Sequence, residues 1–362
     1  MKICYLSDAN SIHTKKMCRF FIDKGYDVSI ISLNDGEIPG AKVYSMELKI
    51  DKNKSTIKKL NYLNQIRNIK KIIDDINPDI IHAHYASSYG LIGRFINRKP
   101  YILSVWGSDI YDFPKKSIIH KYIIKSNLKS ADVLMSTSNV MKKETEKYTE
   151  KEILVTPFGV DTNKFKPFNN KRNDNCIVIG TIKSLEDKYG IDYLIKAFNI
   201  VKNKNPNKNI ILKIAGVGSK LENYKKLVQE LSLEKYVEFL GFIDQNEIIK
   251  RFNEFDIACF PSTLDSESFG VAAVEAQACG TSLIVSDVDG LKESTNPGVT
   301  SLMVRRKSVN DLAEKLELLI ENSDLRKELS LNGRKYVLDN YDMNKNFSLI
   351  DNCYKEFMKG KN

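Results

Sequence analysis

The chain has 362 residues, which exceeds what one hydrophobic core usually serves and fits two domains of ordinary size. Hydrophobic residues make up 42% and charged residues 28%, so the composition excludes a disordered or fibrous protein and indicates a soluble, globular one. No apolar run reaches the length that spans a bilayer, and Asp8 interrupts the N-terminus before a signal-peptide core could form. We therefore expect a cytoplasmic protein without a membrane span or a secretion signal.

The net charge of +10 is unevenly distributed along the chain. Residues 1–170 hold 28 Lys and Arg against 18 Asp and Glu, whereas the two classes balance in residues 171–362. A general enrichment in lysine would affect both halves alike, so the asymmetry favours an anionic acceptor or an anionic membrane surface as a partner of the first half. No nucleic-acid recognition motif accompanies the charge, and nucleic acid is not an expected partner.

Short β-branched runs alternate with segments of helical period in the first half, a pattern typical of a parallel sheet with crossover helices. The expected strands are residues 2–7, 27–32, 79–85, 101–107, 132–138 and 152–158. Between the second and third strands, apolar residues recur at helical spacing from Thr56 to Ile76 and leave a lysine-rich opposite face. These elements predict a first Rossmann-like α/β domain over residues 1–165.

A polar stretch from Asn163 to Asn175 has no periodicity and is expected to link two domains. The alternation then restarts, with expected strands at 176–182, 209–216, 236–241, 256–261, 281–287 and 300–304, and helices at 190–203, 219–232, 246–255 and 270–280. The second domain is expected over residues 166–342, with the C-terminal helix, 343–362, packing back on the first. Doubly wound sheets bind ligands at the carboxyl ends of their strands, so we expect the site in the cleft between the domains.

The run SESFGVAAVEAQACG contains Glu267 and Glu275 on either side of an expected helix start. If the helix begins near Phe269 and Gly270, the amides of Phe269, Gly270 and Val271 would face an anion at the positive end of the helix dipole. Carboxylates in these places accept hydrogen bonds from sugar hydroxyls. The alternative is an ordinary helix start with favourable acids, capped by a neighbouring serine.

The run IGTIKSLEDKYG places Lys183 and Lys188 in a loop after a strand that is expected to end at Gly180. Two cations on one loop at the carboxyl edge of a sheet can neutralise a diphosphate leaving group without a metal ion. The alternative is a chance pair in a lysine-rich chain. The run IAGVGSK, which includes Gly216, resembles part of a dinucleotide fingerprint but lacks its third glycine, so a plain strand-to-helix turn is favoured.

Four segments, in this order and spacing, resemble the family 4 retaining glycosyltransferases of the GT-B fold. They are the segment PFGVDTNKF at 157–165, the segment 180–190, the AGVG turn at 215–218, and Glu267 to Glu275 with the intervening Ser-Phe-Gly. The resemblance covers nearly the whole chain. It implies two Rossmann-like domains and transfer of a sugar, with retention, from a nucleotide sugar that is expected to be a UDP-sugar. The implied acceptor is a glycan or lipid-linked glycan in surface-polysaccharide or glycoconjugate biosynthesis.

The resemblance assigns roles to the donor-side residues. Lys183 and Lys188 would bind the diphosphate, Glu275 the ribose hydroxyls, and Glu267 with the amides of 269–271 the transferred sugar. Two glycines fall in the same donor-binding segments, Gly180 and Gly216. Lys183 stands where the family usually has arginine, which exchanges a bidentate fork for a point charge. In the family's mechanism the acceptor attacks on the face from which the diphosphate leaves, so positioning and charge stabilisation replace a covalent nucleophile.

Two segments of the first half are expected on the acceptor side. Residues 7–16 are placed in the first strand-to-helix loop, and residues 104–109 at the end of the fourth strand. Family members often carry histidine, glycine and aspartate in the second segment; here Trp106 replaces the histidine and Asp109 remains. Trp106 is either a sugar-stacking platform or a core residue. Three histidines lie near expected strand ends and are candidates for acceptor contact or for structural roles: His13, the preferred functional one, His82 and His84.

No metal ion or cofactor is expected. No carboxylate cluster is expected near the phosphate-binding loops, and the six cysteines lack metal-ligand spacing and are expected to be buried small hydrophobes. Lysines and a helix start would take the place of a cation. Two other functions stay open: a nucleotide-sugar 2-epimerase of the same architecture, which needs acid and base carboxylates and no acceptor site, and a non-catalytic sugar-nucleotide or glycan-binding protein.

The basic first half also predicts peripheral contact with anionic lipid at the inner face of a membrane. The expected carriers lie on the back of the helix at 56–76, and they are Lys58, Lys59, Arg67, Lys70 and Lys71. An ordinary solvated helix face is the alternative.

Overall fold

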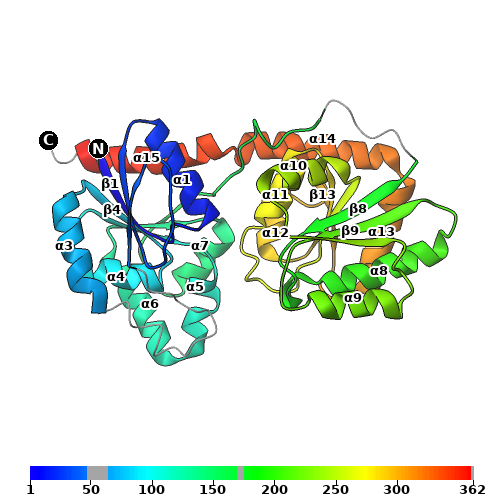
Figure 1. Ribbon diagram of the computed structural model, residues 1–362, viewed down its shortest axis with the longest axis horizontal. Coiled ribbons are helices and arrows are strands. Elements are labelled where there is room, and N and C mark those ends of the chain that lie inside the picture. Colours follow the sequence, from blue (N-terminus) through cyan, green and yellow to red (C-terminus); the bar gives the residue numbers. More distant parts are fainter. Residues whose placement is uncertain (47–63, 169–174, 360–362) are drawn as a thin grey trace. The chain divides into compact units, whose positions relative to one another are not determined.

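The computed structural model describes residues 1–46, 64–168 and 175–359, and the chain forms two compact units (Figure 1). The first unit comprises Met1–Phe158 and Asn344–Asn362, and the second comprises Gly159–Met343. The division expected after residue 165 stays a prediction about domains. The compact units divide earlier because residues 159–165 pack on the second unit, where Val160 donates to the Tyr341 carbonyl and Phe165 is fully buried.

The described part of the first unit contains a parallel sheet of seven strands in the order β3-β2-β1-β4-β5-β6-β7. Its strands are β1 (Lys2–Leu6), β2 (Asp27–Ser32), β3 (Lys42–Ser45), β4 (Ile80–His84), β5 (Tyr101–Val105), β6 (Val133–Ser136) and β7 (Ile153–Val155). The central strands β4 and β5 are buried along their whole length, as expected for a sheet covered on both faces. Six of the seven were predicted. The edge strand β3 was missed because it has only four residues and none of them is more than half-buried, which leaves a weak apolar pattern.

Helices cover the first sheet. They are α1 (Ile12–Asp23), α3 (Ile66–Ile76), α4 (Ser88–Ile96), α5 (Ser108–Tyr111), η2 (Phe113–Lys116), α6 (Ile118–Ser130), α7 (Asn139–Glu146) and α15 (Met343–Lys359). Serine side chains cap α1, α6 and α7, where each accepts a hydrogen bond from the third residue of its helix. Because α1 begins at Ile12, the loop expected over residues 7–16 is shorter than predicted and His13 lies in the helix. The helix expected from Thr56 is described only from its later part, with α3 beginning at Ile66.

The second unit repeats the same strand order, β10-β9-β8-β11-β12-β13, again all parallel. Its strands are β8 (Ile177–Ile182), β9 (Ile210–Ala215), β10 (Val237–Gly241), β11 (Ile257–Phe260), β12 (Ser282–Ser286) and β13 (Ser301–Val304). Every expected strand of this half is present. The range expected for the first one, 176–182, matches β8, but the placement of a strand end at Gly180 is wrong, because β8 continues to Ile182.

The helices of the second unit alternate with its strands. They are η3 (Asp187–Tyr189), α8 (Ile191–Lys204), α9 (Leu221–Glu230), α10 (Gln245–Glu254), α11 (Val271–Ala278), α12 (Asp289–Thr295), α13 (Val309–Glu321) and α14 (Ser323–Asn340). Two apolar clusters fill the faces of the sheet, one centred on α8 and α13 and the other on α11. The unit therefore has a complete core of its own.

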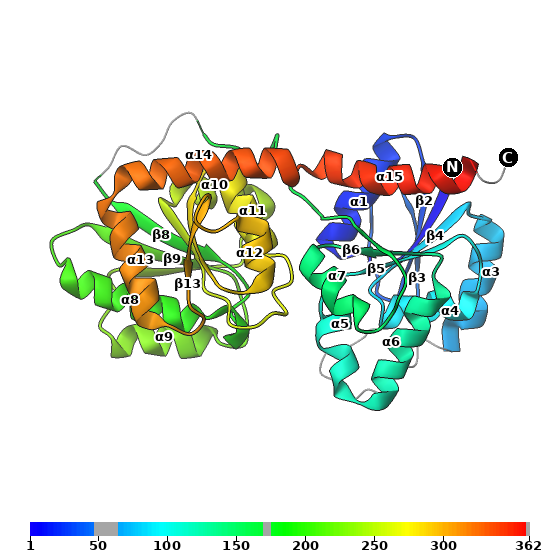
Figure 2. The ribbon, with the colours of Figure 1, turned by 180° about the vertical axis from the view of Figure 1, so that it is seen from behind.

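Helix α15 packs on the first unit and lies beside α1 in both views (Figures 1 and 2). Its Tyr354 hydroxyl lies 2.5 Å from His82 Nδ1 and 3.2 Å from the Tyr5 hydroxyl. His82 Nε2 lies 2.7 Å from the Ser104 hydroxyl, so both ring nitrogens are satisfied. Asp351, one turn earlier on α15, accepts hydrogen bonds from Lys24 and Tyr26, which hold its pKa at about 2. His82 is thus a structural histidine that joins the C-terminal helix to the sheet.

The stability of this joint should depend on pH. Burial lowers the pKa of His82 to about 3 and that of neighbouring His84 well below its usual value, so the folded chain holds both rings neutral. The unfolded chain takes up protons below pH about 6.5, so stability is full above that pH and falls below it, by up to about 1.4 kcal/mol per pH unit for each ring. Asp351 adds its own loss only below pH about 4. Urea unfolding measured between neutral pH and pH about 5 should show a net decrease. The buried Asp109 carboxyl, whose pKa burial raises to about 6, takes up a proton in the folded chain and offsets part of the loss.

A matched pair of variants isolates the histidine effect. His82→Gln should make the unfolding free energy less dependent on pH, by the contribution of one ring. His120→Gln, outside this network, should leave the pH dependence of the unfolding free energy unchanged. An unfolding free energy that is the same at both pH values in the wild type would contradict the assignment.

Candidate functional site

The second sheet reverses its strand order between β8 and β11, the place where open α/β sheets bind ligands. The loop after β8 carries Lys183 and the loop after β11 carries Glu267. Lys183 Nζ lies 2.7 Å from Glu267 Oε2, and the two side chains are only 13% and 8% exposed. The structure therefore joins two of the predicted donor residues in a buried ion pair across the reversal.

The ring of Tyr189 lies between the two predicted lysines. Lys183 Nζ is 4.7 Å and Lys188 Nζ is 4.8 Å from the ring centroid, so both cations make cation–π contacts with the same ring. Glu267 balances Lys183, whereas Lys188 has no ion-pair partner among the described residues. The site therefore offers one uncompensated positive charge to a ligand. The sequence argument missed Tyr189, whose only signal was its place directly after Lys188.

Two glycines of the AGVG turn let the β9 loop close against the loop that carries Lys183. A Cβ on Gly216, at φ 136°, would lie 1.8 Å from the Lys183 carbonyl oxygen, and one on Gly218 would lie 2.4 Å from that of Leu185. The two loops are also joined by hydrogen bonds from the amides of Lys183 and Leu185. In this structure Gly216 thus allows the close approach of the two loops that positions Lys183.

Lys188 is fixed through its backbone. Its carbonyl accepts a 2.8 Å hydrogen bond from the amide of Thr263, which follows β11. Gly190 ends the same turn at φ 65°, and a Cβ there would lie 2.1 Å from the Pro261 carbonyl oxygen. The β8 and β11 loops are therefore tied together at a second point. Gly180 lies below them in β8, where the Phe255 ring occupies the space that a side chain would need, 2.2 Å from the Cβ position.

Helix α11 begins at Val271, with Gly270 as the residue before it in a left-handed conformation. This agrees with the start expected near Phe269 and Gly270. Phe269 itself is buried and packs edge-on against Tyr341, with ring centroids 5.1 Å apart. Gly270 is the N-cap residue and has no side chain to cap the helix. Glu275 follows in the second turn and is half-buried.

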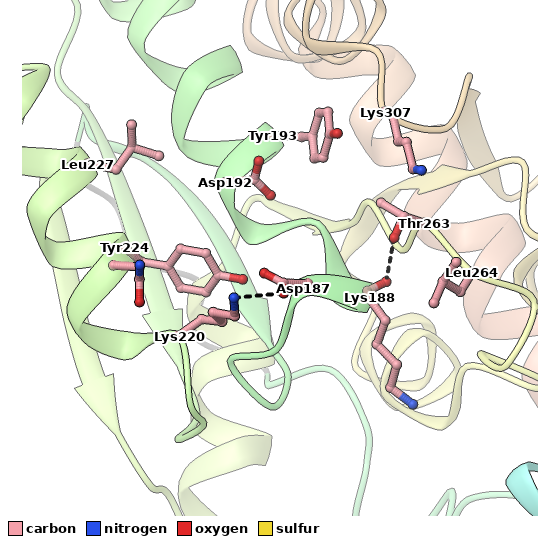
Figure 3. A pocket seen from close by; sticks show the side chains of 11 residues that line it. Asp187, Lys188, Asp192, Tyr193, Lys220, Tyr224, Leu227, Thr263, Leu264 and Lys307 are labelled. Atoms are coloured by element: carbon pink, nitrogen blue, oxygen red, sulfur yellow. Dashed lines mark hydrogen bonds and ion pairs between the residues drawn. The ribbon is translucent and has the colours of Figure 1, made fainter. Parts of the chain in front are cut away.

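A pocket of about 510 Å³ lies beside η3 in the second unit (Figure 3). Its lining includes Asp187, Lys188, Tyr193, Lys220 and Tyr224, with an ion pair of 2.8 Å between Asp187 and Lys220. The Lys188 side chain points away from Tyr193 in this view. Among the predicted donor residues, Lys188 is the one that lines this pocket.

Metal independence was expected partly because the chain was taken to lack an Asp-x-Asp motif, and this is wrong. Asp287 and Asp289 form such a pair, a pattern that other enzymes use to hold a metal ion. Asp287 pairs with Arg306 at 3.2 Å, and Asp289 pairs with Lys292 at 2.6 Å. Each carboxylate is thus balanced by a cation of this chain. Within residues 1–46, 64–168 and 175–359, no three His, Cys, Asp or Glu side chains form a group that could hold a metal ion.

The first sheet reverses its order between β1 and β4, and polar residues meet there as well. His84, at the end of β4, has Nδ1 2.9 Å from the hydroxyl of Ser7, which follows β1. The Trp106 ring stacks on His84 with centroids 4.4 Å apart, and the His13 ring stacks on Phe158 at 3.9 Å. The structure therefore brings together His13, His84 and Trp106, while His82 is committed to α15.

Two ring nitrogens in this aromatic cluster are available to a ligand. His13 Nδ1 and His84 Nε2 are buried and have no hydrogen-bond partner among the described residues. Burial lowers the pKa of His13 to about 3 and that of His84 well below its usual value, so both rings are neutral at pH 7. A neutral imidazole can accept a hydrogen bond from a hydroxyl or donate one to it.

Asp109 holds the loop that carries Trp106. Its carboxylate accepts hydrogen bonds from the amides of Ala86 at 2.7 Å, Gly107 at 2.8 Å and Trp106 at 3.2 Å. It is fully buried, which raises its pKa to about 6 against the opposing effect of these amides. Its geometry fits a positioning residue, and its predicted contact with an acceptor stays a prediction.

The family model "Glycosyl transferase 4-like" matches residues 2–138, and "Glycosyl transferases group 1" matches residues 162–336. The chain belongs to glycosyltransferase family 4. This glycosyltransferase is 29% identical over 270 residues to an uncharacterized glycosyltransferase of Methanocaldococcus jannaschii, covering 74% of this chain and 72% of the relative.

Two further proteins resemble it. One is the N,N'-diacetylbacillosaminyl-diphospho-undecaprenol alpha-1,3-N-acetylgalactosaminyltransferase of Campylobacter jejuni, 26% identical over 300 residues and 76% of each chain. The other is an Anabaena protein solved with UDP-glucose, with a TM-score of 0.80 and 18% identity over 98% of this chain and 100% of that one. The fold of the glycosyltransferase is GT-B, and the enzyme uses a nucleotide sugar. Among its described helices, none has the length and apolar character of a membrane span.

The Lys183–Glu267 pair makes a prediction about stability. Removing one partner leaves the other charge buried and unpaired, so Lys183→Met or Glu267→Gln should each lower the unfolding free energy by about 3 kcal/mol. The double variant should recover most of that loss. Urea unfolding of the four proteins measures the coupling, and additive losses in the double variant would show that the pair does not hold the loops together.

Proposed function

We propose that this glycosyltransferase moves a sugar from a UDP-sugar, with retention of configuration, to a glycan or lipid-linked glycan acceptor in surface-polysaccharide or glycoconjugate biosynthesis. The observation that carries the proposal is the cluster of Lys183, Lys188 and Glu267 at the strand reversal of the second unit. Lys183 forms an ion pair with Glu267, and both lysines contact the ring of Tyr189. A diphosphate with a sugar attached has the charge and the hydroxyls that these groups recognise. UDP-glucose is also the ligand in the Anabaena protein of the same fold.

The diphosphate gains negative charge as the bond to the sugar breaks. Lys188 offers the uncompensated cation, and the start of α11 would add the positive end of a helix dipole. Lys183 adds a second cation whose place is set by Glu267. We propose that these groups suffice for the leaving group, with neither metal ion nor cofactor.

The two glutamates would take separate parts of the donor. Glu267 uses Oε2 for Lys183, which leaves Oε1 to accept a hydrogen bond from a hydroxyl of the transferred sugar. Glu275, half-buried on the second turn of α11, would accept the ribose hydroxyls. Because Glu267 is held by Lys183, its carboxylate is oriented before the donor binds.

The acceptor would be bound by the first unit. His13 Nδ1 and His84 Nε2 offer neutral hydrogen-bonding groups, and Trp106 offers an aromatic surface for a sugar. Asp109 would act by fixing the Trp106 loop. The acceptor of the Campylobacter jejuni relative is a diphospho-undecaprenol-linked sugar, which is anionic and lipid-linked. The excess of positive charge in residues 1–170 suits an acceptor of that chemistry.

A panel of UDP- and GDP-sugars tests the proposed reaction. A UDP-sugar should raise the melting temperature, and transfer to a polyprenyl-diphosphate glycan should proceed in the presence of EDTA. Assays with and without acceptor separate transfer from epimerisation of the free nucleotide sugar and from binding alone. Loss of activity in EDTA that Mn²⁺ or Mg²⁺ restores would contradict the metal-free mechanism.

Lys188 carries the second prediction for this reaction. Removing one preorganised charge from a leaving group costs about 3 kcal/mol, so Lys188→Ala should lower kcat about a hundredfold while the protein stays folded. Lys196→Ala is the matched control, since Lys196 is an exposed lysine of α8 that pairs with Asp192. A folded Lys188→Ala variant with the kcat of the control would remove Lys188 from the diphosphate site.

A further inference from the structure

The first two turns of α6 expose three large apolar side chains next to one another. Ile118 is 87% exposed, Ile119 is 71% exposed and Tyr122 is 67% exposed. On a helix, residues four apart lie on one face, so Ile118 and Tyr122 are neighbours and Ile119 adjoins them. Within the described chain, this is a cluster of apolar surface rather than a single exposed residue.

The opposite face of α6 fixes this orientation. Ile124 and Leu128 are fully buried in the core of the first unit. Asn127 is buried between them and donates a 2.8 Å hydrogen bond to the Ala86 carbonyl. Ser117 caps the helix start. The outward direction of the isoleucines therefore follows from firm packing on the other side of the helix.

Lysines surround the apolar cluster. Residues 112–130 contain five lysines and a single acidic residue, Asp112. Lys115 and Lys116 precede the helix in η2, and Lys121 and Lys125 lie at helical spacing from Ile118 on the exposed face. Apolar side chains ringed by basic ones match a surface with acyl chains beneath anionic head groups.

Helix α3, the expected carrier of membrane contact, lacks this combination. Its described part exposes Arg67, Lys70 and Lys71, but Asp74 and Asp75 follow within one turn and are also exposed. Its isoleucines are buried or half-buried in the core of the unit. Lys58 and Lys59 lie outside the described residues. The structure therefore favours α6 over α3.

We propose that the α6 tip, defined as Ile118, Ile119 and Tyr122 with Lys115, Lys116, Lys121 and Lys125, docks on an anionic lipid bilayer. The two isoleucines enter the acyl boundary, Tyr122 lies among the head groups, and the lysines contact lipid phosphates. This inference rests on the proposed function, since a lipid-linked acceptor is presented at such a surface. A second copy of the chain fits less well, because a symmetric contact would bring lysines of the same sign together.

Co-sedimentation with vesicles tests the docking surface. The wild type should bind vesicles of phosphatidylcholine with phosphatidylglycerol, and binding should weaken at least tenfold as salt rises from low to above physiological strength, because exposed charges are screened. Vesicles of phosphatidylcholine alone should bind at least tenfold less. Ile118→Asp/Ile119→Asp and Lys121→Glu/Lys125→Glu should each reduce binding to anionic vesicles about tenfold or more.

Two controls match these variants. Leu318→Asp/Leu331→Asp places the same two charges at exposed leucines of α13 and α14, and Lys70→Glu/Lys71→Glu reverses the same number of charges on α3. Both should bind vesicles within about twofold of the wild type once the difference in net charge is allowed for by the salt series. Circular dichroism and thermal unfolding show whether each variant is folded.

The outcomes separate docking from catalysis. Transfer to a soluble acceptor analogue should be the same in Ile118→Asp/Ile119→Asp as in the wild type, so loss of vesicle binding with retained transfer supports the proposal. Equal vesicle binding by wild type and this variant would overturn it, as would a concentration-dependent dimer that the variant abolishes. Absence of sugar transfer in every variant and the wild type would instead contradict the proposed function.

Discussion

The buried ion pair between Lys183 and Glu267 determines the geometry of the donor side. Two charges that leave water lose several kcal/mol of hydration each, and the loss is offset only if they stay in contact. The contact therefore fixes the distance between the β8 and β11 loops. The glycines serve the same end, because a side chain at Gly216 or Gly190 would collide with the backbone that the pair draws together. The same contact between the loops positions Lys188, because the amide of Thr263 in the β11 loop donates a hydrogen bond to the Lys188 carbonyl.

The two units use one strand order but fill its reversal with different chemistry. In the second unit the reversal holds charges, which suit a diphosphate that becomes more negative during the reaction. In the first unit it holds Ser7, His84 and Trp106, whose groups are neutral at pH 7 because burial keeps the imidazole unprotonated. Neutral hydrogen-bonding groups and an aromatic ring suit sugar hydroxyls, which carry no charge. The same fold thus presents a charged site in the second unit and an uncharged, hydrogen-bonding and aromatic site in the first.

The sequence predicted the elements whose burial imposes a continuous apolar pattern, and it failed where burial is partial or set by distant contacts. Edge strand β3 has half-buried residues and was missed. Gly180 resembles a strand end in the sequence, but the Phe255 ring packs over it inside the strand. Tyr189 had no pattern that would mark it as the ring between two lysines. The partner of Glu267 was equally hidden, since Lys183 is far from it in sequence and only the strand reversal brings them together.

The net charge of a sequence has the same limitation, because it gives the excess of charged residues but not where they lie on the folded surface. The excess of residues 1–170 pointed to the lysine-rich back of the helix expected at 56–76, yet Asp74 and Asp75 balance much of the charge on its described part. In α6 the run of apolar residues resembles an ordinary core helix, and no periodicity reveals that Ile118 and Ile119 face outward. That direction follows from the inner face, where Ile124 and Leu128 are buried in the core and the buried amide of Asn127 donates to the Ala86 carbonyl. These inner contacts fix the rotation of the helix and therefore decide which apolar side chains the lysines surround on the outer face.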